Sequence, residues 1–229
     1  TLWNKWPLPE NNPGRRRSNK KEMQMRFFPK QFVSSLIFMA AAMVLLWLPA
    51  SAHAAESTLR VGIAEEPRTL NVWMATDANS NKILSLIYQP LYTEHPETLE
   101  LTPWLAKAMP EWDADTNTYT MELRKAKWSD GSPVTAEDVV FTVNTIKSFK
   151  VPKYHSEWEF VEKAEAVDKQ TVRFYLEEPR ATFLTRSLIN YVMPKKQWAP
   201  IVKQAKEKEK PLGALLNARV EKPLGCGPF

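Results

Sequence analysis

The chain has 229 residues, of which 44% are hydrophobic and 25% are charged, with a single cysteine and six glycines. This composition is ordinary for a globular protein, so it excludes wholesale disorder and a polytopic membrane protein. One cysteine also excludes an intrachain disulfide framework and any metal site built from several cysteines.

The net charge of +5 is unevenly distributed along the sequence. Residues 1–54 contain eight basic and two acidic side chains, whereas residues 55–229 contain 23 basic and 24 acidic ones. The globular part is therefore nearly neutral, and the basic total is no evidence for a nucleic-acid partner.

The first 54 residues are typical of an export signal preceded by extra sequence. Residues 1–22 are predicted to be an upstream extension, and residues 23–54 a signal peptide with Arg26 and Lys30, an apolar run over 32–48, and two A-x-A sites within 50–54. An uncleaved anchor is the alternative, because about 17 apolar residues is the lower limit for crossing a bilayer. Pro49 and the small residues after it favour cleavage. No cysteine lies near the cleavage point, so we expect an exported protein that is not a lipoprotein.

Downstream, short strands alternate with helices. Alternating apolar residues predict strands over 59–63, 119–123 and 172–176. A polar stretch over 71–81 is predicted to be irregular, and a helix over 83–91 is expected to stop near Pro90. The charge run over 203–210 is typical of a solvated helix face.

The segment 127–141 (KWSDGSPVTAEDVVF) is the most informative part of the sequence. Asp130-Gly131 is a turn dipeptide whose glycine permits positive φ. Thr135 is expected to cap a helix, with Asp138 in the position of a capping-box acid. Trp128 is expected to pack in the core, so each of these residues is interpreted as part of the scaffold rather than as a ligand contact.

No motif indicates an enzyme. The chain lacks H-E-x-x-H, C-x-x-C, G-x-S-x-G and P-loop patterns. Glu177 and Glu178 are adjacent in a predicted strand and would point to opposite faces. We therefore expect no catalytic residue, no metal site and no cofactor.

The pattern W-S-D-G-x-P-V-T-A-x-D-V, from Trp128 to Val139, resembles the signature region of the family 5 extracytoplasmic solute-binding proteins, which are peptide- and nickel-binding receptors of ATP-driven importers. The resemblance covers residues 58–229. Cys226 departs from it, because the family usually has threonine there. Supporting matches are Leu59–Gly62, Ile87–Tyr92, Pro103–Ala106, Tyr119–Arg124, Glu177–Pro179 and Pro223–Phe229.

The resemblance implies an α/β, periplasmic-binding-protein-like two-lobed fold of type II with an extra subdomain. Residues 55–88 and 188–229 would form an incomplete first lobe, and residues 89–187 the inserted subdomain with the signature. The chain is accordingly expected to be an N-terminal fragment that contains only the first lobe and this subdomain.

The resemblance also implies where a solute would bind. In peptide-binding members the loop between the first strand and first helix lines the cleft and pairs its main chain with the peptide. An ordinary surface loop is the alternative. Small residues near the interlobe crossover would admit close backbone approach or hinge rotation. The corresponding ligand-binding candidates are Thr76, Asp77, Ala78, Asn79 and Ser80 in the loop, and Gly225, Cys226 and Gly227 near the crossover.

The implied function is capture of an oligopeptide or peptide-like solute in the periplasm for delivery to an inner-membrane ATP-binding-cassette permease. Ligand would stabilise a closed arrangement of the lobes through its higher affinity for that state. A sensory or interaction module of the same fold, without transport, is the alternative.

Overall fold

The computed structural model describes residues 62–63 and 65–228, and these belong to one compact unit that begins at Arg60. The predicted upstream extension, signal peptide and most of the first predicted strand lie outside the described residues. Gly62 and Ile63, at the end of that predicted strand, are not in a strand. Within the described part of the chain, no helix is long and apolar enough to cross a membrane.

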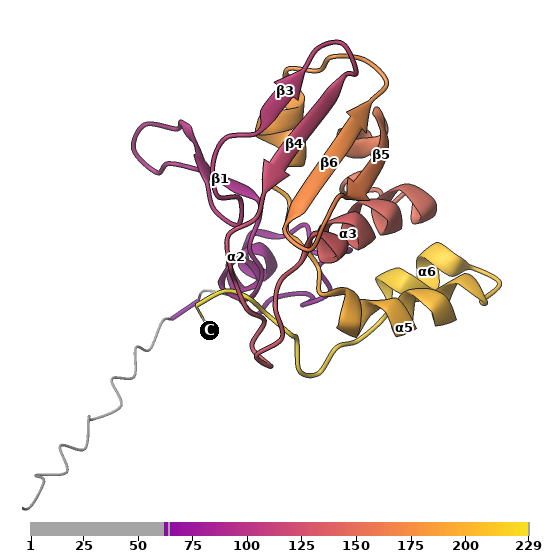
Figure 1. Ribbon diagram of the computed structural model, residues 1–229. Helices are drawn as coiled ribbons and strands as arrows, with labels where there is room; N and C mark the ends of the chain where they lie inside the picture. The colour runs from indigo at the N-terminus through magenta and orange to yellow at the C-terminus, as the bar shows by residue number, and fades with distance from the viewer. Residues whose placement is uncertain (1–61, 64, 229) are drawn as a thin grey trace, which may run out of the picture. The chain divides into compact units, whose positions relative to one another are not determined.

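Two antiparallel sheets and several helices make up the unit (Figure 1). The larger sheet has the strand order β3-β4-β6-β5, and β1 pairs with β2 in a separate hairpin. The elements in chain order are α2 (Ala78–Ile87), β1 (Tyr92–Glu94), β2 (Leu101–Pro103), β3 (Glu111–Asp113), β4 (Thr118–Glu122), α3 (Ala136–Phe149), α4 (His155–Trp158), β5 (Val161–Ala166), β6 (Thr171–Leu176), the π-helix η1 (Phe183–Ser187), α5 (Lys195–Lys206) and α6 (Pro211–Leu216).

The predicted strands over 119–123 and 172–176 are confirmed as β4 and β6. Alternate side chains of β6 face the core of the protein. Val172, Phe174 and Leu176 are buried, and the residues between them are partly exposed. α3 packs against β5 and β6, and it presents Val139 and Val143 to this core.

The helix predicted over 83–91 is α2, which begins and ends earlier in the sequence than predicted, at Ala78 and Ile87. It ends at Ile87 because the chain then turns into an extended conformation at Tyr88. Leu91 is not in the helix, although it is buried in the core. The segment predicted to be irregular over 71–81 therefore contains the first turn of α2, whereas residues 71–77 are not helical.

The turn and the capping box of the signature segment are confirmed. Gly131 has φ of 83°, a conformation that favours glycine. The backbone N of Thr135 donates to Asp138 Oδ2 at 2.9 Å, and α3 begins at the next residue. Trp128 is only 3% exposed, as expected of a packing residue. The charge run is solvated, but α5 ends at Lys206 and the rest of the run is not helical.

Candidate functional site

Ala78, Asn79 and Ser80 of the first group of predicted ligand-binding residues form the first turn of α2 rather than a loop, whereas Thr76 and Asp77 precede the helix. This corrects the expectation of an irregular segment. Asp77 is the N-cap, and its Oδ1 accepts the backbone N–H of Ser80 at 2.9 Å. Ser80 is buried, whereas Thr76 and Ala78 are exposed. Hydrogen bonds from the side chain and then the backbone of Ser80 lower the pKa of Asp77, so this carboxylate is ionised at neutral pH.

Two backbone amides at the start of α2 remain available. The first helical hydrogen bond runs from Asn81 N to Asp77 O at 3.0 Å. The amides of Ala78 and Asn79 precede this bond and have no acceptor among the described residues. Such amides attract carbonyl or carboxylate oxygens, because the helix dipole adds to their positive charge.

Lys153 lies beside this end of α2. Its Nζ donates to Asn81 Oδ1 at 3.0 Å and lies 4.9 Å from the centre of the Tyr154 ring. Burial lowers the pKa of Lys153 below its usual value. Nothing in the local sequence identifies Lys153, because it lies 72 residues beyond the side chain that it contacts.

The second group of predicted ligand-binding residues, Gly225 to Gly227, lies at the other end of α2. The backbone N–H groups of Cys226 and Gly227 both donate to Ile87 O, at 3.0 and 2.9 Å. A Cβ at Gly225 would lie 2.5 Å from the same oxygen. The close backbone approach expected of these glycines is thus made to the last turn of α2. Contact with a ligand stays a prediction for this group.

The structure does not bring the two predicted groups together. A ten-residue helix is about 15 Å long, and the groups lie at its two ends. An extended peptide of about five residues would span that distance.

An aromatic hollow of about 480 Å³ opens at the C-terminal end of α2. Tyr88 and Tyr191 line it, with ring centres 6.4 Å apart. Burial raises the pKa of Tyr88 to about 12, so its phenol is neutral at physiological pH. Burial likewise raises the pKa of Cys226 to about 11. The thiol is therefore protonated and poorly nucleophilic.

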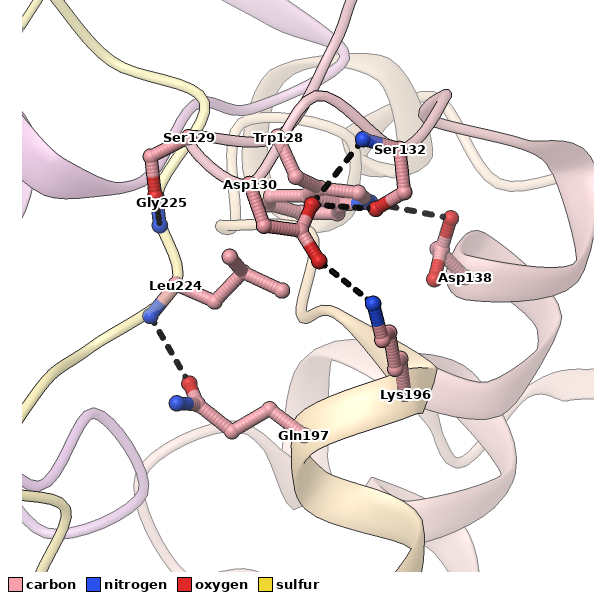
Figure 2. A network of polar contacts seen from close by, with 9 residues as sticks. All are labelled: Trp128, Ser129, Asp130, Ser132, Asp138, Lys196, Gln197, Leu224 and Gly225. Atoms are coloured by element: carbon pink, nitrogen blue, oxygen red, sulfur yellow. Dashed lines mark hydrogen bonds and ion pairs between the residues drawn. The ribbon is translucent and has the colours of Figure 1, made fainter.

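The signature segment forms a polar network that joins three parts of the chain (Figure 2). Ser129 N donates to Gly225 O at 2.7 Å, and Gly225 N donates to Ser129 Oγ at 3.4 Å. The Oδ2 of Asp130 accepts Lys196 Nζ of α5 at 2.6 Å. This hydrogen bond, with those from Ser132, holds the pKa of Asp130 well below its usual range.

A buried carboxylate completes the network. Asp138 is 6% exposed, and its Oδ2 accepts Thr135 N at 2.9 Å and Trp128 Nε1 at 3.4 Å. Its Oδ1 accepts Lys195 N at 2.8 Å. The signature therefore holds the start of α3, the start of α5 and the C-terminal segment together.

A metal-binding cluster is not found in the described part of the chain. Residues 62–63 and 65–228 contain no cluster of three or more histidine, cysteine, aspartate or glutamate side chains that could hold a metal ion. The exposed His95 accepts the amides of Glu97 and Thr98 at 3.3 Å. The Nδ1 of His155 is buried, and it has no partner among the described residues.

Comparison with known proteins defines the class. A sequence model described as "Bacterial extracellular solute-binding proteins, family 5 Middle" matches residues 100–229, which is more than half of the chain. The chain belongs to this family, and the resemblance carried by the signature is confirmed.

Among curated relatives, the chain is 33% identical over 180 residues to Protein XP55 of Streptomyces lividans, covering 77% of this chain and 30% of that protein. It is 29% identical over 174 residues to the probable peptide-binding protein YejA of Agrobacterium fabrum, covering 75% of this chain and 27% of YejA. The chain thus spans less than a third of the length of both relatives.

Solved structures give the same assignment. The oligopeptide-binding protein AppA from Bacillus subtilis, in complex with a nonapeptide, has a TM-score of 0.56 and 25% identity, covering 69% of this chain and 30% of AppA. NikZ from Campylobacter jejuni, in complex with Ni(L-His), has a TM-score of 0.55 and 25% identity, covering 72% of this chain and 30% of NikZ. The fold is that of the two-lobed periplasmic binding proteins, as predicted, and the chain covers part of it. These relatives are binding proteins rather than enzymes. The boundaries at 88/89 and 187/188 stay predictions.

Proposed function

We propose that this chain is part of an extracytoplasmic receptor that binds an oligopeptide or peptide-like solute and delivers it to an ATP-binding-cassette permease of the inner membrane. Membership of family 5 is the observation that carries the proposal. A nonapeptide complex of AppA and the name of YejA support a peptide as the solute. Two other similar structures are complexes with Ni(L-His) and with agropinic acid, so the test includes those ligands.

The start of α2 is the proposed contact on this chain. The amides of Ala78 and Asn79 lie at an exposed helix end and have no acceptor among the described residues. A peptide carbonyl or terminal carboxylate supplies the acceptor that these amides need, as in strand-like main-chain recognition. Asp77, held ionised by Ser80, would repel a carboxylate placed on its own side and favour a peptide amide there.

Ala78→Pro tests this contact without removing the helix. Ala78 is the first helical residue, a position that tolerates proline, and Asp77 already has the extended conformation that precedes proline well (φ −78°, ψ 154°). The substitution removes one amide donor. We expect affinity for the solute to fall about three- to tenfold, which corresponds to about 1 kcal/mol for one net hydrogen bond.

The measurement is calorimetry on the protein purified from its own host, with a mixed peptide library, Ni(L-His) and agropinic acid as ligands. Ala78→Ser, which keeps the amide, is the matched control and should bind like the unaltered protein. Equal affinity of the two variants would rule out this contact. If no peptide bound but another ligand bound tightly, the proposed class of solute would be contradicted instead.

Delivery to a permease is tested separately by uptake. Cells that lack the gene are expected to lose uptake of the bound solute and to regain it when the gene is restored. Normal uptake in the deleted cells would contradict transport and favour the sensory or interaction module.

A further inference from the structure

A basic groove lies between α5 and the signature loop, away from the start of α2. Its volume is about 850 Å³. One wall is the loop from Trp128 to Thr135, and the other is α5 with Ala199 and Pro200. Pro133 of the loop and Ala199 and Pro200 of α5 line the groove, so it has an apolar floor between the charged side chains. None of the proposed solute contacts lines this groove.

Two ion pairs and a backbone hydrogen bond connect α5 to the other side of the groove. Lys196 of α5 pairs with Asp130 of the loop at 2.6 Å, as Figure 2 shows. Lys195 pairs with Glu137 of α3, and its backbone N donates to Asp138. These contacts connect α5 to the signature loop and to the start of α3, so the groove is present without a bound partner.

Two further lysines of the groove have no carboxylate as an ion-pair partner among the described residues. Lys169, in the turn before β6, and Lys203, on α5, both line the groove and are exposed. Neither lies within 4.0 Å of a carboxylate among the residues that the structure describes. Lys203 lies in a basic stretch, since residues 195–210 contain six lysines and two glutamates in a globular part that is otherwise acidic.

The geometry points to a docking site for an extended acidic segment of a partner protein, with acidic side chains on Lys169 and Lys203 and an apolar side chain against the floor. Charge complementarity is the argument for this occupant. A bilayer surface is flat and would reach the outer lysines without filling a concave apolar floor. The groove is thus an interaction surface separate from the solute contact.

The probe is a fluorescein-labelled peptide of about eight residues, a length that spans a groove of this kind when extended, made of glutamates with two leucines. Its control replaces every glutamate by glutamine. Fluorescence anisotropy with the full chain is expected to show binding of the acidic peptide at about 20 mM salt and weaker binding at about 300 mM. The glutamine peptide is expected to bind about tenfold more weakly.

Substitutions locate the binding. The double variant Lys169→Glu/Lys203→Glu is expected to lower affinity for the acidic peptide by about tenfold or more. The matched control Lys125→Glu/Lys208→Glu makes the same charge change at exposed lysines that do not line the groove, and its affinity should stay within about twofold. An equal loss in both double variants would show non-specific charge attraction and overturn the proposal.

Two more measurements distinguish the groove from the solute site and from a membrane-binding surface. Ala78→Pro is expected to leave binding of the acidic peptide unchanged, and a large loss in this variant would place the probe in the solute site. Binding to vesicles containing phosphatidylglycerol is expected not to depend on Lys169 and Lys203. Vesicle binding that requires both lysines, with no binding of the acidic peptide, would assign the surface to a membrane and overturn the proposal.

Discussion

Gly227 lies where the C-terminal segment passes the last turn of α2, and only a hydrogen atom fits there. A Cβ at this position would collide with the backbone oxygen of Leu86. Because the obstacle is backbone, Gly227→Ala must displace the segment and weaken the bond from its amide to Ile87 O. We expect the free energy of unfolding to fall by about 1–3 kcal/mol, measured by urea denaturation.

Gly213→Ala is the matched control for this prediction. Gly213 lies inside α6, and a Cβ there would have its nearest neighbour at 3.8 Å, in ordinary contact. Alanine is favoured over glycine in a helix, so this variant should gain about 0.5–1 kcal/mol. A loss of the same size in both variants would contradict the close approach at Gly227.

At the scale of elements, the start of α3 depends on Asp138. Its two oxygens accept donors from Thr135, Trp128 and Lys195. Asp138→Asn replaces one acceptor by an NH₂ group that must face a donor. Leaving a buried donor unpaired costs about 1–3 kcal/mol, and we expect that loss in the free energy of unfolding.

Glu137→Gln controls for the charge lost near the same helix end. Glu137 is exposed, and its only ionic partner among the described residues is Lys195. Exposed ion pairs contribute little to stability, so the unfolding midpoint should barely move. If both variants lost equal stability, the helix dipole rather than the buried hydrogen bonds would explain the effect.

Local sequence predicts those elements whose signals are local. The capping box and the apolar face of α3 lie within one segment, and both are confirmed. The local sequence does not predict β5, because VEKAEA is rich in residues that favour helices. Pairing with β6 makes it a strand, since Val161 and Ala164 are then buried against the core. This stabilisation comes from tertiary contacts that no window of sequence contains.

The start of α2 differs from the sequence prediction for another reason. Asn and Ser usually compete with helical hydrogen bonds, so the composition after Asp77 predicts an irregular segment. In the structure Asp77 caps the helix and Ser80 is buried under it. The candidate site is predicted only through the family resemblance. The basic groove is not predictable in this way, because Lys169 and Lys203 line one groove only once α5 has packed beside the signature loop.

For the whole molecule, ionised carboxylates link stability to pH. Hydrogen bonds or lysine partners lower the pKa of five carboxyl groups below their ordinary values of 3.8 and 4.5, and these groups are Asp77, Asp113, Asp130, Glu137 and Asp168. The folded state therefore binds fewer protons than the unfolded state in acid. Their contribution is complete above the unfolded pKa values and is lost as the pH falls through the folded ones.

We therefore expect the urea midpoint to stay nearly constant from about pH 7 to pH 5 and to fall below about pH 4. Asp130→Asn should reduce this acid dependence, because Lys196 and Ser132 then lose the charged acceptor that they stabilise. Asp115→Asn is the control, since the side chain of Asp115 accepts no hydrogen bond within the described residues, and the acid dependence should be unchanged. A midpoint that rises toward low pH would contradict the sign of this linkage. An Asp130→Asn curve with the slope of the unaltered protein would show that the pair with Lys196 does not contribute in solution.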